Sequence, residues 1–229
     1  MPTDRVEATL IMSSLPSCQS VAEEPANLAE LTAELIQARQ TVLPKRLLSP
    51  GPNAAQLARI LEAAAAAPDH GKLTPWRFVI VPTAARGRLA RVFEEALLAR
   101  DATASAEQIA QAGEKSYRAP LLMLAIAKTH EGDSGIDATE RLVSAGCAVQ
   151  NMLLMATALG FGSALTSGKA LRSQPLAQLF DLQQGELALC FISIGTVHAR
   201  RPLPTRPSPS EYVCELSALE RVVYPRAAT

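Results

Sequence analysis

The chain has 229 residues, of which 48% are hydrophobic and 19% are charged. This composition supplies enough apolar material for a packed core and argues against an intrinsically disordered protein. Lysine and arginine together number 22, as do aspartate and glutamate, so the balanced charge gives no general attraction to nucleic acid or to an anionic membrane. The length suits one large domain, or at most two.

The cysteines and histidines indicate neither a disulfide framework nor a metal site. The four cysteines form no CxxC pair, and Cys147 and Cys190 lie within apolar runs, where cysteine behaves as a small hydrophobe. The three histidines are far apart in the sequence and show no metal-ligand spacing. Because neither a signal peptide nor a membrane span is recognisable, we expect a cytoplasmic protein without a membrane partner.

The N-terminal part of the chain contains a short extension and a first helix. We expect residues 1–27 to be loosely structured and residues 28–229 to form one domain. Apolar residues at helical spacing predict a helix over 28–39. Three prolines, at positions 44, 50 and 52, then exclude a regular helix until the next element begins.

The next elements alternate between helix and strand. Asn53 and Gln56 resemble a capping box that starts a helix, and Pro68 ends it. The apolar run at 76–81 predicts a strand. Two polar segments follow, an expected helix over 84–99 and an exposed helix or mobile lid over 101–118.

The C-terminal half contains two continuous apolar runs, at 120–128 and 186–195, which are typical of strands covered on both faces. The segment 144–159 is apolar nearly all round, which predicts a buried helix, and Gly160 can cap it. The residues GFGSALTSG then lead to a short helix near 174–180, and a proline-rich tail ends the chain. Buried strands separated by helices indicate an α/β sandwich.

Arg39-Gln40-Thr41, at the end of the first expected helix, has two interpretations. An arginine at a helix C-terminus suits the helix dipole and needs no further role. An arginine fork beside a hydroxyl group also matches the oxygens of a phosphate. Lys45 and Arg46 are further cations in the same loop.

The stretch APDHGKLTPW places His70 and Lys72 in a short loop between a helix and a strand. Asp69 and Gly71 are standard turn residues. The histidine and the lysine at the entrance of a buried strand are not explained by a turn, and loops held by rigid elements are common positions for binding groups.

Small polar residues in GFGSALTSG, residues 160–168, could line a ligand. The segment is a poor phosphate-binding GxG loop because it follows a helix instead of a strand. Arg200 and Arg201 after the last strand are either solvated or part of an anion site. Since no catalytic acid–base pair is recognisable, the chemistry of an enzyme with this sequence would belong to a cofactor.

Together these motifs resemble the FMN-dependent nitroreductase family, and most closely its small single-domain NAD(P)H nitroreductase branch. Arg39-Gln40-Thr41 resembles the family's Arg-Arg-Ser motif. APDHGKLTPW aligns without gaps to Ala-Pro-Ser-x-x-Asn-x-Gln-Pro-Trp and carries the Ala-Pro-Asp-His variant of the branch. SAGCAVQNMLLMATALGFGS resembles the central helix that ends in glycine, and the resemblance covers about Leu28 to Tyr212.

The chain departs from the family at several of these positions. Gln40 replaces an arginine, Lys72 an asparagine and Thr74 a glutamine. Leu165 and Thr166 stand where the branch can carry tryptophan and arginine.

The resemblance implies a three-layer α/β/α sandwich that forms an obligate homodimer, with FMN at the subunit interface and the helix 144–159 in the dimer core. By motif position, it assigns FMN contacts to four groups of residues. These are Arg39, Gln40 and Thr41 at the phosphate and ribityl chain; His70 beside the flavin, with Lys72 and Leu73 reaching the FMN of the partner; Leu165, Thr166 and Ser167 along the ring or the phosphate side; and Arg200 or Arg201 at the phosphate.

The resemblance further implies an FMN-dependent NAD(P)H oxidoreductase. A hydride would pass from NADH or NADPH to flavin N5 and then to a nitroaromatic, a quinone or a similar small acceptor in a ping-pong sequence. Lys72 near N1 would raise the reduction potential. Two other classes stay open: a protein that binds or sequesters flavin without turnover, which the loss of arginine at Gln40 and the unusual loop residues leave open, and an interaction protein held together by its apolar helix.

Overall fold

The computed structural model describes residues 25–130, 135–199, 202–216 and 222–223. The chain divides into two compact units, residues 1–34 and 35–229. The described part of the first unit is the beginning of helix α1 (Pro25–Ala38), which agrees with the helix expected over 28–39. Residues before 25 lie outside the description, so the expected extension over 1–27 stays a prediction.

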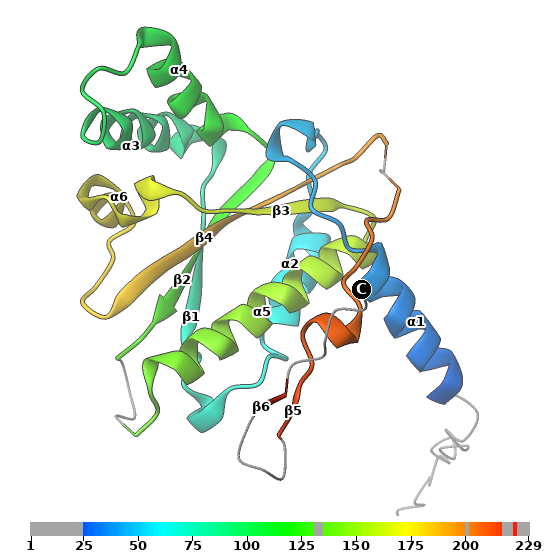
Figure 1. Cartoon of the computed structure of the whole chain (residues 1–229). Coiled ribbons are helices and arrows are strands. Elements are labelled where there is room, and N and C mark those ends of the chain that lie inside the picture. The colour runs from blue at the N-terminus through cyan, green and yellow to red at the C-terminus, as the bar shows by residue number, and fades with distance from the viewer. Residues whose placement is uncertain (1–24, 131–134, 200–201, 217–221, 224–229) are drawn as a thin grey trace, which may run out of the picture. The chain divides into compact units, whose positions relative to one another are not determined.

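The second unit is built on a sheet in which four described strands pair antiparallel in the order β1-β2-β4-β3 (Figure 1). The strands β2 and β4 lie at the centre, and nearly all of β2 is buried, as its continuous apolar sequence predicts. Strands β1, β2 and β4 confirm the expected ones, whereas β3 was not expected. Their bounds are Trp76–Ile80 for β1, Leu121–Lys128 for β2, Gly162–Thr166 for β3 and Glu186–Gly195 for β4.

One face of the sheet is covered by helices α2 (Ala54–Ala64) and α5 (Ala138–Ala158), which also pack on each other. The predicted capping box at the start of α2 is confirmed. The Gln56 N–H donates to Asn53 Oδ1, and the Asn53 N–H donates to Gln56 Oε1, both at 2.9 Å. The predicted glycine cap of α5 is also confirmed, since Gly160 has φ +87° and the Phe161 N–H donates to the Ala156 carbonyl at 2.9 Å.

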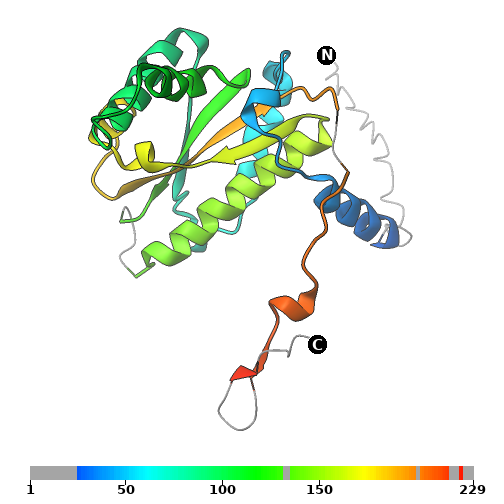
Figure 2. The ribbon, with the colours of Figure 1, turned by 45° about the horizontal axis from the view of Figure 1, so that its top comes forward.

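The opposite face is covered by α3 (Arg86–Leu98) and α6 (Gln174–Leu179), and α4 (Ala106–Glu114) packs on α3. Phe191 of β4 lies in the centre of this layer, with edge-to-face contacts to Phe93 at 5.6 Å and to Phe180 at 5.9 Å between ring centroids. The two views show helices on both faces of the sheet (Figures 1 and 2). The predicted α/β/α sandwich is therefore confirmed.

Short elements connect the layers. Residues 101–118, expected to be an exposed helix or a mobile lid, contain the helix α4. The remaining elements are the 3-10 helices η1 (Pro44–Arg46), η2 (His70–Lys72), η3 (Thr83–Ala85), η4 (Lys115–Tyr117), η5 (Lys169–Arg172) and η6 (Pro209–Glu211), and the paired strands β5 (Glu215–Leu216) and β6 (Val222–Val223).

Two expectations about the central helix need correction. The helix begins at Ala138, six residues before the expected start, because the Asp137 carboxylate accepts the N–H groups of Thr139 and Glu140 at 2.7 and 3.0 Å. The helix is also not buried all round. Val143 is 62% exposed, and Gly146 and Gln150 are exposed one and two turns further along. This exposed stripe belongs to the face turned away from the sheet.

Strand β3 has no counterpart among the expected strands. Its first residues, Gly162, Ser163 and Ala164, are small and have weak preference for strands, so no apolar run marks them. Packing requires this small size, because a Cβ atom on Gly162 would collide with the side chain of Val197. Tertiary contacts therefore form this strand against its local sequence preference.

Candidate functional site

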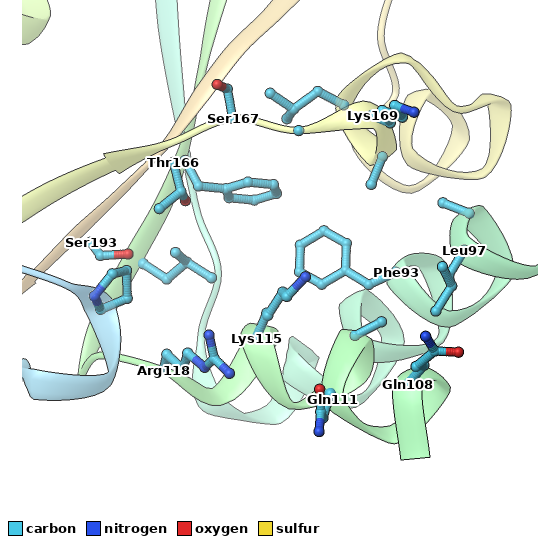
Figure 3. Close-up of a pocket in the computed structure, with 18 of the residues that line it drawn as sticks. Phe93, Leu97, Gln108, Gln111, Lys115, Arg118, Thr166, Ser167, Lys169 and Ser193 are labelled. Carbon is cyan, nitrogen blue, oxygen red and sulfur yellow. The ribbon is translucent and has the colours of Figure 1, made fainter. Parts of the chain in front are cut away.

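A cavity of about 640 Å³ lies between the helices α3 and α4 on one side and the end of β3 with η5 on the other (Figure 3). Thr166 pairs with Phe191 across β3 and β4, and Ala164 pairs with Ser193, so Thr166, Phe191 and Ser193 face the same side of the sheet. The apolar part of the wall consists largely of Phe93, Leu97, Leu122, Leu171 and Phe191. The cavity thus has an aromatic wall and hydroxyl groups at one end.

Positive charge is concentrated at this cavity. Four cationic side chains line it, Arg100, Lys115, Arg118 and Lys169, against the single carboxylate of Asp101. The lining therefore has a formal excess of three positive charges, although the whole chain has a net charge of zero. Figure 3 shows Lys115 and Arg118 extending into the cavity from the α4 side, opposite Thr166. A positively charged cleft with low-dielectric walls favours an anionic ligand.

Arg118 has an unsatisfied hydrogen-bond donor at this position. Within the described ranges, its buried Nε has no hydrogen-bond partner, and its Nη2 lies 3.6 Å from Glu114 Oε2. A buried donor without a partner costs about 1–3 kcal/mol. An acceptor atom of a ligand in the cavity would remove this cost.

Arg86 holds the turn that carries Lys115 and Arg118. Its side chain is only 4% exposed and donates to three carbonyl oxygens: Nε to Val81 at 2.9 Å, Nη1 to Ser116 at 2.6 Å and Nη2 to Pro120 at 3.3 Å. Burial lowers the pKa of this guanidinium. These bonds join the start of α3 to η4 and to the residue before β2, and so fix the direction of the cationic side chains.

The segment Arg39-Gln40-Thr41 lies beside β3. Thr41 forms a parallel bridge with Ser163, and the Val42 N–H donates to the Ser163 carbonyl at 2.9 Å. Arg206 of the tail donates from Nη2 to the Arg39 carbonyl at 3.0 Å. The segment and the cavity are therefore joined through one short strand, from Ser163 to Thr166.

The expected tail arginines Arg200 and Arg201 lie outside the described residues. The tail nevertheless brings another arginine, Arg206, to Arg39. Sequence reasoning missed Arg206 because it lies among prolines in a stretch interpreted as extended surface chain.

The loop 69–74 is held at the N-terminal end of α5. The Asp69 carboxylate accepts the N–H groups of Leu73 at 3.1 Å and of Thr74 at 2.7 Å, and His70 Nδ1 lies 2.8 Å from Glu140 Oε2. Gly71 has φ +72°, and a Cβ atom there would lie 2.6 Å from Ile136 Cδ1. The loop therefore needs glycine at this position, and its conformation is fixed by local contacts.

Within one chain, the loop and the cavity are far apart. The loop leads into β1, whereas Thr166 ends β3 and Ser167 follows it, and these strands are the opposite edges of the sheet. Three strand spacings separate the two edges by about 14 Å. His70, Lys72 and Leu73 do not line the cavity. Leu165 does not line it either: it is 42% exposed, and the next residue, Thr166, is the one in the cavity wall.

Of the residues assigned from sequence, the structure thus places Thr166 and Ser167 in the cavity and Arg39, Gln40 and Thr41 next to the strand that leads to it. Sequence reasoning missed the cavity residues of segment 101–118, among them the two cations Lys115 and Arg118. Nothing in that charged, alanine-rich segment distinguishes side chains that face inward from those that face solvent.

Two further findings concern the described residues. They contain no group of three or more histidine, cysteine, aspartate or glutamate residues that could hold a metal ion. None of the helices placed by the structure is long and apolar enough to cross a membrane.

Comparison with known proteins gives a family and a fold. Residues 36–196 match the model of the nitroreductase family. A Haemophilus influenzae protein named "Putative NAD(P)H nitroreductase" is 34% identical over 152 residues, which are 66% of this chain and 82% of that protein.

Two solved structures share the fold. A nitroreductase-like family protein from Bacillus cereus has a TM-score of 0.66 at 18% identity and covers 79% of this chain and 93% of its own. An FMN-dependent nitroreductase from Clostridium difficile has a TM-score of 0.53 at 18% identity, covering 76% of this chain and 91% of its own.

Proposed function

Because the chain belongs to the nitroreductase family, we propose that it is an FMN-dependent NAD(P)H oxidoreductase that reduces a nitroaromatic, a quinone or a similar small acceptor. The observation that carries this proposal is the cationic cavity with an aromatic wall that ends at Thr166 and Ser167. The names of the Haemophilus relative and of the Clostridium structure support the nicotinamide donor and the flavin, respectively. Location in the cytoplasm is part of the same proposal.

The residues of this chain fit FMN. The cavity volume lies within the range of small-molecule sites, and its aromatic wall suits a planar ring. The orphaned Nε of Arg118 suits a ring carbonyl or nitrogen acceptor. Arg39, Thr41 and Arg206, on the other side of β3, would hold the phosphate, and Arg206 would supply the second cation that Gln40 does not.

Bound FMN would supply hydride transfer, which explains why the chain needs no catalytic acid–base pair. The side chains have supporting roles. Phe93 and Phe191 exclude water from the ring, and the Lys115 ammonium group favours negative charge on it. Within one chain Lys115 is the candidate for this role, whereas Lys72 would act only from a second copy, because it does not line the cavity of its own chain.

We further propose the homodimer. A second copy would bring its loop 69–74 to the flavin, which one chain alone does not do, since this loop and the cavity are at opposite edges of the sheet. The exposed stripe of α5 suits such contact. Val143 is exposed, and no heavy atom lies within 4 Å of a Cβ placed on Gly146, so another helix could approach there closely.

The test is the visible absorption spectrum of the freshly purified protein, followed by anaerobic addition of NADH or NADPH. We expect yellow protein that bleaches with at least one donor and recovers its colour with an acceptor. Yellow protein that never bleaches would favour the flavin-sequestering alternative. Colourless protein that FMN does not reconstitute would contradict the proposed function.

A further inference from the structure

The same cavity carries an inference about its substrate that rests on the proposed function. We propose that the enzyme prefers electron acceptors that carry an anionic group, such as a carboxylate, on an aromatic ring. The proposal is based on cationic side chains of the cavity that are not needed to bind the flavin.

The cations of the cavity come from three separate parts of the chain. Lys115 and Arg118 extend from the α4 side and are assigned to the flavin ring. Arg100, two residues beyond the end of α3, and Lys169, the first residue of η5, also line the cavity. Two cationic side chains therefore remain for the molecule that enters after the flavin is bound.

The surroundings of these two cations suit an aromatic molecule. Leu97 and Phe93, one and two turns before Arg100 on α3, supply an apolar wall, and Figure 3 shows Leu97 and Lys169 at the same end of the cavity, on facing walls. A flat ring against this wall has its substituents near the cations. The combination of apolar wall and positive rim favours an aromatic acid over its neutral analogue.

One negative group opposes this preference. The Asp101 carboxylate accepts the backbone N–H of Thr103 at 3.0 Å and its hydroxyl at 2.7 Å, and these hydrogen bonds lower the pKa of Asp101. The group is therefore charged at neutral pH and partly offsets Arg100. Substitution of Asp101 would therefore make the cavity more positive, and substitution of Arg100 or Lys169 would make it less positive.

For a nitro acceptor the reaction balances with the donor already proposed. The nitro compound, NAD(P)H and one proton give the nitroso compound, NAD(P)⁺ and water. The nitrogen loses one oxygen, which leaves as water, and the electron pair comes from the nicotinamide. The anionic group takes no part in bond making and affects only binding and orientation.

The experiment compares 4-nitrobenzoate with 4-nitrobenzamide, which have similar shapes and differ in charge. Specificity constants are measured for the parent and for Lys169→Gln, Arg100→Gln, the double variant and Asp101→Asn. Arg91→Gln is the matched control, because Arg91 is an exposed arginine of α3 that does not line the cavity. FMN content is measured for every variant.

We expect the double variant to lower kcat/KM for 4-nitrobenzoate about tenfold, since each exposed ion pair changes binding by at most about fivefold. The amide should change less than twofold, and Asp101→Asn should raise the constant for the acid. Salt at 0.5 M should remove most of the difference between acid and amide. Arg91→Gln should affect neither acceptor.

Equal losses for acid and amide would overturn the inference, as would an effect confined to the KM of NAD(P)H, which would assign the cations to the donor. Titration calorimetry with each acceptor and no donor provides a readout without turnover. Tighter binding of the acid, lost in the double variant, would support the inference even if no donor bleaches the protein. A failure to bleach would thus count against the proposed function alone.

Discussion

The two faces of the sheet are packed in different ways. On the face covered by α2 and α5, small side chains let the central helix approach the strands closely. Ala145, Ala148 and Ala156 of α5 are fully buried around Met152. This face is a closed apolar core.

On the opposite face, aromatic side chains and the α3–α4 pair leave space above the end of β3. This space is supported by polar contacts of the backbone. Arg86 joins three segments through their carbonyl groups. The cavity in this fold is therefore supported by a polar scaffold of its own, whereas the closed face is stabilised by burial of apolar side chains.

The closed face should be the most sensitive to loss of volume. Met152→Ala, at a fully buried position, should lower the free energy of unfolding by about 3 kcal/mol through lost burial and the cavity left behind. Denaturant unfolding followed by circular dichroism measures this. Leu98→Ala, at an exposed position of α3, is the control and should cost less than about 0.5 kcal/mol. Similar costs at both positions would contradict the comparison.

The face that carries the cavity, here called the open face, should lose most stability when Arg86 is replaced. Arg86→Met leaves three carbonyl groups without their donor and should cost about 2 kcal/mol of unfolding free energy. The variant should also bind FMN more weakly, because Lys115 and Arg118 lose their support. Arg86→Lys should recover part of both effects, and Arg91→Met is the surface control. Unchanged stability in Arg86→Met would show that the polar scaffold is dispensable.

Charge in the cavity should affect the flavin more than the fold. Lys115→Gln should lower the midpoint potential of bound FMN by about 30 mV, equivalent to about 1.4 kcal/mol, because a cation near the ring favours its reduced, negatively charged form. Lys72→Gln is the matched variant outside the cavity lining. Spectroscopic titration against a reference dye measures both. A larger shift for Lys72→Gln would return this role to the loop.

A pH-dependent ion pair joins the strands β1 and β4 across β2. Arg77 Nη2 donates to Glu186 Oε2 and its Nε to Glu186 Oε1, both at 2.6 Å, and this interaction lowers the pKa of Glu186. The stabilisation is therefore complete above the unfolded pKa, about 4.3, and is lost as the pH falls through the lower pKa of the folded state.

Glu186→Gln should consequently cost about 1 kcal/mol at pH 7, since the glutamate is buried and the arginine partly so. The difference from the parent protein should shrink as the pH falls below 4. Unfolding free energies measured between pH 3 and pH 7 test this. A constant difference over that range would mean that the ionised carboxylate is not the stabilising form.

Much of the fold could be predicted because local chemistry determines it. The apolar runs of β1, β2 and β4, the capping box at Asn53 and the stop at Gly160 all appear in the sequence and in the structure. Strand β3 could not be predicted in this way. Its glycine and small residues satisfy a packing requirement against Val197, which no local pattern reveals.

The residues proposed for the site could be predicted only where a motif marks them. Thr166 and Ser167 follow from the family motif and lie in the cavity. Lys115 and Arg118 carry no such mark, because their direction depends on the packing of α4 on α3 and on the bonds of Arg86. Those contacts join residues about 30 positions apart, beyond the range of helical or strand periodicity.

The smallest effect on stability is expected in the loop 69–74, which contacts the start of α5 on the closed face. His70 and Glu140 are 69% and 47% exposed, so their ion pair contributes less than about 0.5 kcal/mol, and Asp69 holds the loop without it. His70→Ala should therefore leave the melting temperature nearly unchanged.

If the loop faces the flavin of a second copy, the same variant, His70→Ala, should weaken FMN binding several-fold, as measured by fluorescence titration. Glu140→Gln removes the same ion pair but keeps the imidazole, and should retain FMN. Equal FMN affinity in both variants would confine His70 to a local contact on its own chain.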